Sequence, residues 1–202
     1  MKTSALVAAL FATAAFAPFP AHAGTTITFP LTVSKGAHTC LPRAHGTVVD
    51  HSFGEFENLE VVVAGLPPNT GFDLFSIEVP NAPFGLAWYI GDIQTDATGG
   101  GVGNFVGRFN IETFIISPGV PTAAPPNVFQ APPAVVPEAT IGIETNPVQL
   151  YHLGLWFNSS DDAAKAGCPN TATPFNGEHD AGIQVLNTAT FPNAAGPLFN
   201  LR

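Results

Sequence analysis

Hydrophobic residues recur at alternate positions along most of the chain, in short runs separated by Gly and Pro. Alternation of this kind places apolar side chains on one face of a β-strand, and frequent turn residues are typical of sandwiches and barrels. The pattern predicts strands over 25–33, 57–64, 72–79, 86–95, 102–116, 138–144, 148–157 and 182–189. We therefore predict an all-β fold, an antiparallel β-sandwich of Ig-like or jelly-roll type with one short helix, forming a single domain over 24–202.

Two of these predicted strands are the most informative. In 102–116 one face is apolar, whereas Arg108, Asn110 and Glu112 share the other face. This polar face is either a solvated sheet surface with a structural ion pair or a recognition surface. In 148–157 both faces are apolar, which predicts a central strand that is covered on both sides.

A short helix is predicted just before the second of the two cysteines. Ser159 or Ser160 can cap its first turn, and Gly167 ends it next to Cys168. Cys40 is the other cysteine, so one disulfide is expected in an oxidising compartment. Two unpaired thiols that act as metal ligands or nucleophiles are the alternative. The disulfide would tie the first part of the domain to its last part.

The beginning of the chain has the pattern of a signal peptide. A basic start precedes the apolar run 5–17, and Ala21 and Ala23 supply the small residues that signal peptidase requires. We therefore predict that 1–23 is removed, that the mature chain begins at Gly24, and that the protein is secreted or held at the cell envelope. The apolar run is too short to span a bilayer and no second long one follows, so no membrane span is expected.

Charge and missing motifs narrow the function further. Six Lys and Arg stand against fifteen Asp and Glu, a formal net charge of −9. Because no basic cluster could displace counterions from a phosphate backbone, a nucleic-acid partner is not expected. The sequence also lacks nucleophile-elbow, zinc-protease, paired-cysteine and phosphate-loop motifs. A binding or structural protein is therefore expected rather than an enzyme.

The segment 117–137 contains seven prolines. Proline lacks a backbone N–H and cannot sit in a sheet interior, so the segment is predicted to be an extended crossover on the surface between two strands. A ligand for a proline-binding partner is the alternative.

Three histidines of the N-terminal part, His38, His45 and His51, are candidate metal ligands. Imidazole nitrogens, with carboxylates such as Asp50 close by, suit zinc or copper. Gaps of seven and six residues match no helical or zinc-finger spacing, so only a turn could bring the rings together. A metal-binding protein or hydrolase is thus one alternative function, and surface polar residues are the simpler interpretation. His152, in an apolar strand, is expected to be a hydrogen-bonded core histidine.

Two further groups of residues are candidates for a binding surface. Trp88 and Tyr89 point to opposite faces of a predicted strand, so at most one is in the core, and an exposed aromatic ring could stack on a sugar. A carbohydrate-binding module is therefore a second alternative function. Glu178, His179 and Asp180 form the densest polar run, which is either a structural turn or a site with a base or a cation ligand.

Four blocks of the sequence, GLPPNT at 65–70, NAPFGLAWY at 81–89, GRFNIETF at 107–114 and FNGEHDAGIQVL at 175–186, resemble a group of uncharacterised secreted bacterial proteins, chiefly actinobacterial. The similarity extends over about 61–197. It implies export and a shared fold, and it carries over no activity and no site residue. The sequence as a whole predicts a secreted binding or structural module of the cell exterior.

Overall fold

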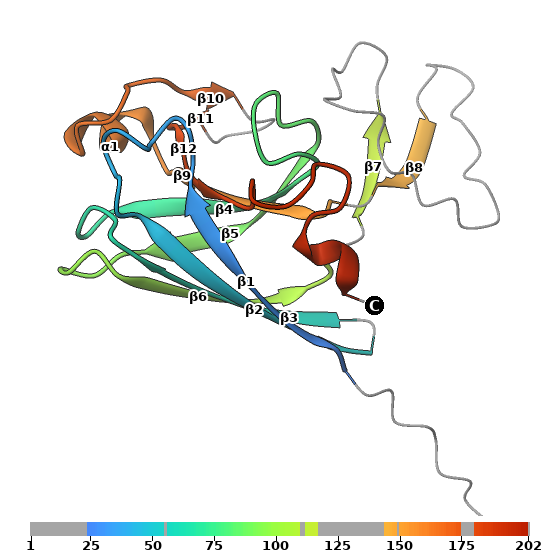
Figure 1. Ribbon diagram of the computed structural model, residues 1–202. Helices are drawn as coiled ribbons and strands as arrows, with labels where there is room; N and C mark the ends of the chain where they lie inside the picture. Colours follow the sequence, from blue (N-terminus) through green and yellow to red (C-terminus); the bar gives the residue numbers. More distant parts are fainter. Residues whose placement is uncertain are drawn as a thin grey trace, which may run out of the picture.

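The computed structural model describes residues 24–54, 56–109, 112–116, 144–148, 150–174 and 180–201. Eight strands form one antiparallel sheet in the order β5-β4-β9-β12-β1-β2-β3-β6 (Figure 1). These strands are β1 (Thr26–Val33), β2 (His45–Phe53), β3 (Phe56–Ala64), β4 (Gly71–Ile77), β5 (Ala87–Gln94), β6 (Gly101–Gly107), β9 (His152–Phe157) and β12 (Gln184–Asn187). The remaining elements are β7 (Glu112–Ile116) paired with β8 (Glu144–Val148), β10 (Thr173–Pro174) paired with β11 (Asp180–Ala181), the helix α1 (Ser160–Lys165) and the 3₁₀-helix η1 (Pro197–Asn200).

The sheet curls until its two outermost strands, β5 and β6, lie in contact. A Cβ atom on Gly91 of β5 would lie 2.5 Å from the ring of Phe105 on β6, so the missing side chain lets this ring cover the seam between the two strands. The described part of the chain is thus nearly all-β and nearly barrel-like, which confirms the predicted class. A two-sheet sandwich of Ig-like or jelly-roll type is not confirmed.

The interior of the curled sheet is filled by inward-facing side chains of every strand. Alternate residues of β1, β2 and β3 point inward, as the burial pattern of each strand shows. The largest fully buried apolar side chains of this interior are Leu31, Leu59, Phe72, Leu74, Ile93, Leu153, Leu155, Phe157 and Leu186. Burying each of them contributes about 1.5–3 kcal/mol relative to exposure, so this cluster is the main source of stability.

The strand predicted over 148–157 is shorter in the structure, because Val148 ends β8 and β9 begins at His152. β9 is buried on both faces, as the sequence predicts for this part of the chain. Its inward residues belong to the barrel interior, whereas Trp156 points outward. Trp156 packs with Phe75, Ile77 and Ala181 in a second, smaller cluster on the outer side of the sheet. The outer face of β9 is therefore covered by protein and not by solvent.

The prediction of a single strand over 102–116 is wrong, because the structure has two separate strands there, β6 and β7. β6 ends at Gly107, and β7 pairs with β8 outside the eight-stranded sheet. The predicted alternation does hold up to this break, with Val102 and Val106 exposed on the outer face. The backbone N–H of Phe109 donates to the side chain of Glu57 and not to a neighbouring strand, which ends the pairing of β6.

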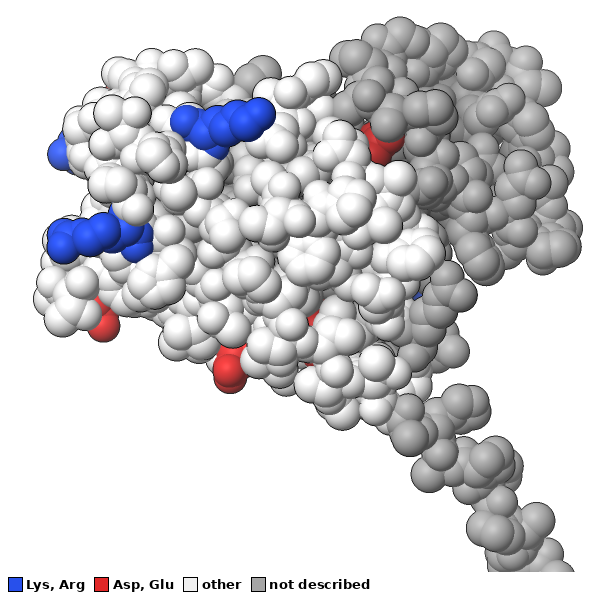
Figure 2. Space-filling view, viewed as in Figure 1, with Lys and Arg blue, Asp and Glu red and all other residues white. Residues whose placement is uncertain are grey.

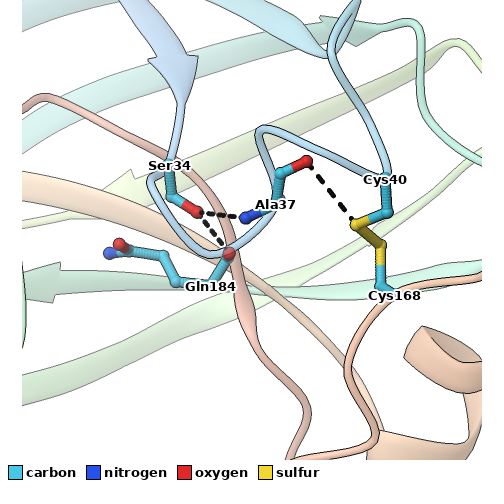
Figure 3. The surroundings of a disulfide bond; sticks show 5 residues. All are labelled: Ser34, Ala37, Cys40, Cys168 and Gln184. Atoms are coloured by element: carbon cyan, nitrogen blue, oxygen red, sulfur yellow. Dashed lines mark hydrogen bonds between the residues drawn. A yellow bond between two sulfur atoms is a disulfide. The ribbon is translucent and has the colours of Figure 1, made fainter.

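The disulfide joins the loop after β1 to the end of α1 (Figure 3). Cys40 and Cys168 are bonded, with Cα atoms 5.2 Å apart, which confirms the predicted pair. The loop is held in place by Ser34, whose hydroxyl donates to the carbonyl of Gln184 at 2.5 Å and accepts the N–H of Ala37 at 3.3 Å. The disulfide therefore fastens the loop after β1 to the segment that follows α1.

The helix α1 begins and ends where the sequence predicts. The hydroxyl of Ser159 accepts the backbone N–H of Asp162 at 3.1 Å, and Asp161 and Asp162 occupy the first turn, where the helix dipole favours negative charge. Gly167 follows the helix with a φ of +76°, a conformation that glycine adopts at little cost. These signals end the helix at the position that allows Cys168 to bond to Cys40.

Replacing the capping serine tests this assignment. Ser159→Ala should lower the free energy of unfolding by about 1 kcal/mol, because one N–H of the first turn loses its acceptor. Ser160→Ala is the matched control, since Ser160 is already inside the helix and should tolerate alanine. Urea unfolding of both variants measures the difference, and equal losses would show that Ser159 is not the cap.

Candidate functional site

The two consecutive aromatic residues of β5 are both exposed. The side chain of Trp88 is 48% exposed and that of Tyr89 is 36% exposed. Trp88 pairs with Ser76 of β4 and Tyr89 pairs with Phe75, so the two rings lie on opposite faces of the strand. Large aromatic side chains normally pack in protein cores or at interfaces. Two exposed ones on the same strand therefore mark β5 as a candidate contact surface.

Tyr89 is held in one orientation by its neighbours. Its hydroxyl donates to Asp92 Oδ1 at 2.5 Å, and its ring lies edge-on to Phe75 with centroids 5.6 Å apart. Burial, the hydrogen bond to Asp92 and the charges of Asp92 and Asp73 all raise the pKa of Tyr89 above its ordinary range. The hydroxyl therefore stays protonated and keeps donating to Asp92, which fixes the orientation of the ring.

A layer of aromatic rings supports Tyr89 from below. Phe75 lies edge-on to Trp156 at 5.4 Å, and Phe84 contacts Trp156 at 5.0 Å. A Cβ atom on Gly154 would lie 2.3 Å from the Trp156 ring, so this glycine makes the space that the indole fills. Because Trp156 is fully buried, the layer under Tyr89 is rigid.

The loop that leads into β5 is fixed by buried polar side chains. Glu78 Oε2 accepts the backbone N–H of Leu86 at 3.0 Å. Asn187 donates from Nδ2 to the carbonyl of Pro80 at 2.9 Å and to Gln184 Oε1 at 2.8 Å. Glu78 therefore closes the loop 78–86 on itself, and Asn187 ties the loop to β12, which holds the beginning of β5 in place.

Two acidic side chains inside the barrel were not predicted as a functional pair. Asp50 on β2 is fully buried and Glu57 on β3 is 5% exposed, and both point inward. Burial, with the charge of Glu57 adding to it, raises the pKa of Asp50 to about 7. They lie near the end of the barrel where β2 turns into β3, which we call the hairpin end.

The three candidate metal ligands do not converge. His45 and His51 lie on the same outer face of β2, but six residues of strand separate them by about 20 Å. His45 Nδ1 lies 2.9 Å from the carbonyl of Arg43, His51 Nδ1 lies 2.7 Å from Thr26 Oγ1, and His38 is exposed in the loop before Cys40. One ion cannot be shared at this separation. Within the described ranges no three His, Cys, Asp or Glu side chains come close enough to hold a metal.

His152 is a core histidine, as predicted. Its Nε2 lies 3.2 Å from the carbonyl oxygens of Pro192 and Asn193, so Nε2 carries the proton, and Nδ1 accepts from the Thr188 hydroxyl at 2.8 Å. Burial lowers the pKa of His152, against the opposing effect of these hydrogen bonds. The neutral imidazole thus fastens the segment after β12 to β9.

The other candidate residues either lie on separate elements or fall outside the residues that the structure describes. Arg108 is exposed after the end of β6, and Glu112 begins β7, so the two do not share one strand face as predicted. Asp180 lies in β11, next to the Ala181 that packs against Trp156. The positions outside the described residues are Asn110, Glu178, His179, the predicted signal peptide 1–23 and the proline-rich 117–137.

A hollow of about 500 Å³ opens beside the disulfide. It is lined by Gly36, Thr39, Cys40, Gly167, Cys168 and Pro169. Both cysteines are consumed by the disulfide, so the lining supplies no thiol, acid or base. The hollow therefore offers backbone groups and the hydroxyl of Thr39.

Charged side chains are sparse on the face that Figure 2 shows. The blue Lys and Arg side chains lie mainly on the side where Figure 1 places α1, and single red Asp and Glu side chains are scattered elsewhere. The described residues on this face form no continuous basic surface. None of the described helices has the length and apolar character needed to cross a membrane.

Comparison with known proteins adds no assignment to this geometry. The chain matches no protein-family model, no curated protein and no solved structure. The similarity to secreted actinobacterial proteins therefore stays a prediction.

Proposed function

We propose that this protein is an exported binding module of the cell exterior that recognises its ligand through the aromatic surface of β5. The observation that carries the proposal is the exposure of Trp88 and Tyr89 on β5, which pairs with β4 and lies in contact with β6. A binding surface that is already rigid loses little conformational entropy when a ligand docks.

Export is supported by two independent features of the chain. The residues 1–23 have the pattern of a cleavable leader, and Cys40 and Cys168 form a disulfide across the domain. Disulfides persist in oxidising compartments outside the cytosol. We infer that the mature protein begins at Gly24 and works outside the cell or on its envelope.

The chemistry of the β5 surface favours a carbohydrate ligand. The ring of Tyr89 offers an apolar face for a sugar ring, and Asp92 beside it offers carboxylate oxygens to hydroxyl donors. Ligand sites commonly combine aromatic side chains with a few fixed polar groups in this way. Trp88 presents a second, larger ring on the opposite face of the strand.

Retention on insoluble polysaccharides tests the proposal. The wild-type protein should be retained on at least one polysaccharide of a panel that includes cellulose, chitin and a bacterial cell-wall preparation. Tyr89→Ala or Trp88→Ala should weaken the retention about tenfold, the equivalent of about 1.4 kcal/mol, because one stacking surface is lost. The variant that loses retention identifies the face of β5 that the ligand uses.

Phe56→Ala is the matched control, because Phe56 is an exposed aromatic on β3 with 53% of its side chain accessible and lies outside β5. It should bind like the wild type. Free passage of the wild-type protein through every matrix, or retention that neither β5 substitution weakens, would end the proposal.

A further inference from the structure

The barrel interior holds two carboxyl groups at its hairpin end. Asp50 is fully buried, and neither of its side-chain oxygens has a hydrogen-bond partner in the described part of the chain. Glu57 is also buried, and its Oε2 accepts the backbone N–H of Phe109 at 2.5 Å. We call this hydrogen bond the Glu57 latch.

The latch fixes the point at which the chain leaves the barrel. β6 ends at Gly107, the next side chain, Arg108, is exposed, and Phe109 turns back into the core, where it is 6% exposed. A Cβ atom on Gly107 would lie 2.9 Å from the Phe109 ring, so the ring packs directly on the end of β6. Phe109 is thus held by its buried ring and by one hydrogen bond to a carboxylate.

No cation among the described residues faces Asp50 from the elements around it. The inward side chains are apolar on β1 (Ile27, Phe29, Leu31), on β3 beyond Glu57 (Leu59, Val61, Val63), on β9 and β12 (Leu153, Leu155, Leu186), on β6 (Phe105) and on η1 (Leu198). His51 lies on the outward face of β2, and Arg108 is exposed. A charge on Asp50 would therefore stand in apolar surroundings, beside the charge of Glu57.

We propose that Asp50 and Glu57 make the latch a pH-sensitive switch, which is closed while Asp50 holds a proton and opens when Asp50 releases that proton to water. Ionised Asp50 repels the Glu57 carboxylate and lacks hydration while it stays inside. Movement of the Phe109 segment out of the barrel end admits water to both carboxylates. This switch is a property of the fold and does not depend on the ligand proposed for β5.

The direction of the pH effect follows from the raised pKa of Asp50, about 7 in the closed barrel, compared with about 4 for an aspartate in water. Opening exposes Asp50 to water, so the pKa of Asp50 is lower in the open form. The population of the open form therefore increases as the pH rises. Between about pH 4 and pH 7 the opening equilibrium constant should increase about tenfold per pH unit, and above about pH 7 it should level off.

Amide hydrogen exchange at Phe109, corrected for the intrinsic pH dependence of exchange, measures the latch directly. From pH 5 to pH 8 the opening constant at Phe109 should increase about a hundredfold. At pH 8 it should exceed the opening constant of Leu155, in the middle of β9, by at least tenfold, because the latch opens without global unfolding. In Asp50→Asn the Phe109 value should stay near its pH 5 level throughout.

Glu60→Gln is the matched control, since Glu60 lies on β3 but is exposed on the outer face, and it should keep the wild-type pH dependence. A Phe109 value that does not change with pH, or that equals the Leu155 value at pH 8, would overturn the switch. So would the same pH dependence in Asp50→Asn as in the wild type. If Asp50→Asn fails to fold, carboxyl-carbon NMR of the wild type decides: a midpoint near pH 7 for Asp50 supports the switch, and one near pH 4 refutes it.

Discussion

Removing the disulfide by the double substitution Cys40→Ser and Cys168→Ser should lower the free energy of unfolding by about 3–5 kcal/mol. The bond spans 128 residues of sequence, and closing a loop of that length in the unfolded chain accounts for about 5 kcal/mol in the chain-entropy model. Cys168 is also buried, so a serine there places a hydroxyl in an apolar setting. Urea unfolding of the oxidised wild type and the double variant gives the difference.

The wild type with a strong reductant is the control for this experiment, because it breaks the same bond without changing the packing residues. Its unfolding midpoint should fall close to that of the double variant. Identical midpoints for the oxidised and the reduced wild type would mean that the bond between Cys40 and Cys168 does not stabilise the barrel.

Asp50→Asn should have the second large effect, and it should stabilise the protein. The pKa of Asp50 is raised from 3.8 to about 7 in the folded state, which corresponds to about 4 kcal/mol of folding free energy that is lost as the pH rises from about 4 to 7. Asparagine removes the charge but keeps a buried amide, so the expected gain at pH 8 is about 2–4 kcal/mol. At pH 4, which lies close to the unfolded-state pKa and well below the folded-state pKa of Asp50, the gain should be small.

Urea unfolding of the wild type and of Asp50→Asn at pH 4, 6 and 8 measures this effect. The wild type should lose stability from pH 4 to pH 7, whereas the curve of the variant should be flatter. Curves that run parallel, or a variant less stable than the wild type at pH 8, would show that Asp50 is not a buried carboxyl of raised pKa.

Local signals in the sequence are enough to predict several parts of the fold. β9 is recognisable because both faces of the predicted strand over 148–157 are largely apolar, and the structure buries 152–157 entirely. α1 is recognisable because Ser159, the acidic first turn and Gly167 are all short-range signals. Cys40 and Cys168 had no other partner, so their pairing needed no knowledge of the fold.

β2 and the break after β6 are not predictable in the same way. The inward face of β2 contains Gly46 and Asp50 in place of apolar residues, so the expected alternation is missing. The break arises because the backbone of Phe109 bonds to Glu57, a residue that is distant in the sequence. Only the folded sheet brings these two together.

The candidate site shows the same division. Because Trp88 and Tyr89 point to opposite faces of the strand, the sequence allows both rings to be exposed. The contacts that hold Tyr89 in place, through Phe75, Trp156 and Asp92, depend on strand register and could not be predicted. The burial of Asp50 inside the barrel was not predicted from the sequence. Its signal in the sequence is its place on the same face as Val48, two residues before it, which puts a carboxyl among inward-facing side chains.

We propose that the chain leaves the cytosol and folds as an oxidised, sheet-built binding module. The most direct measurement is the intact mass of the protein recovered from the medium or envelope of a bacterial host that expresses the full chain. We predict a product that begins at Gly24 and is lighter by two hydrogen atoms than its dithiol form. A full-length product that remains in the cytosol with both thiols free would contradict the account.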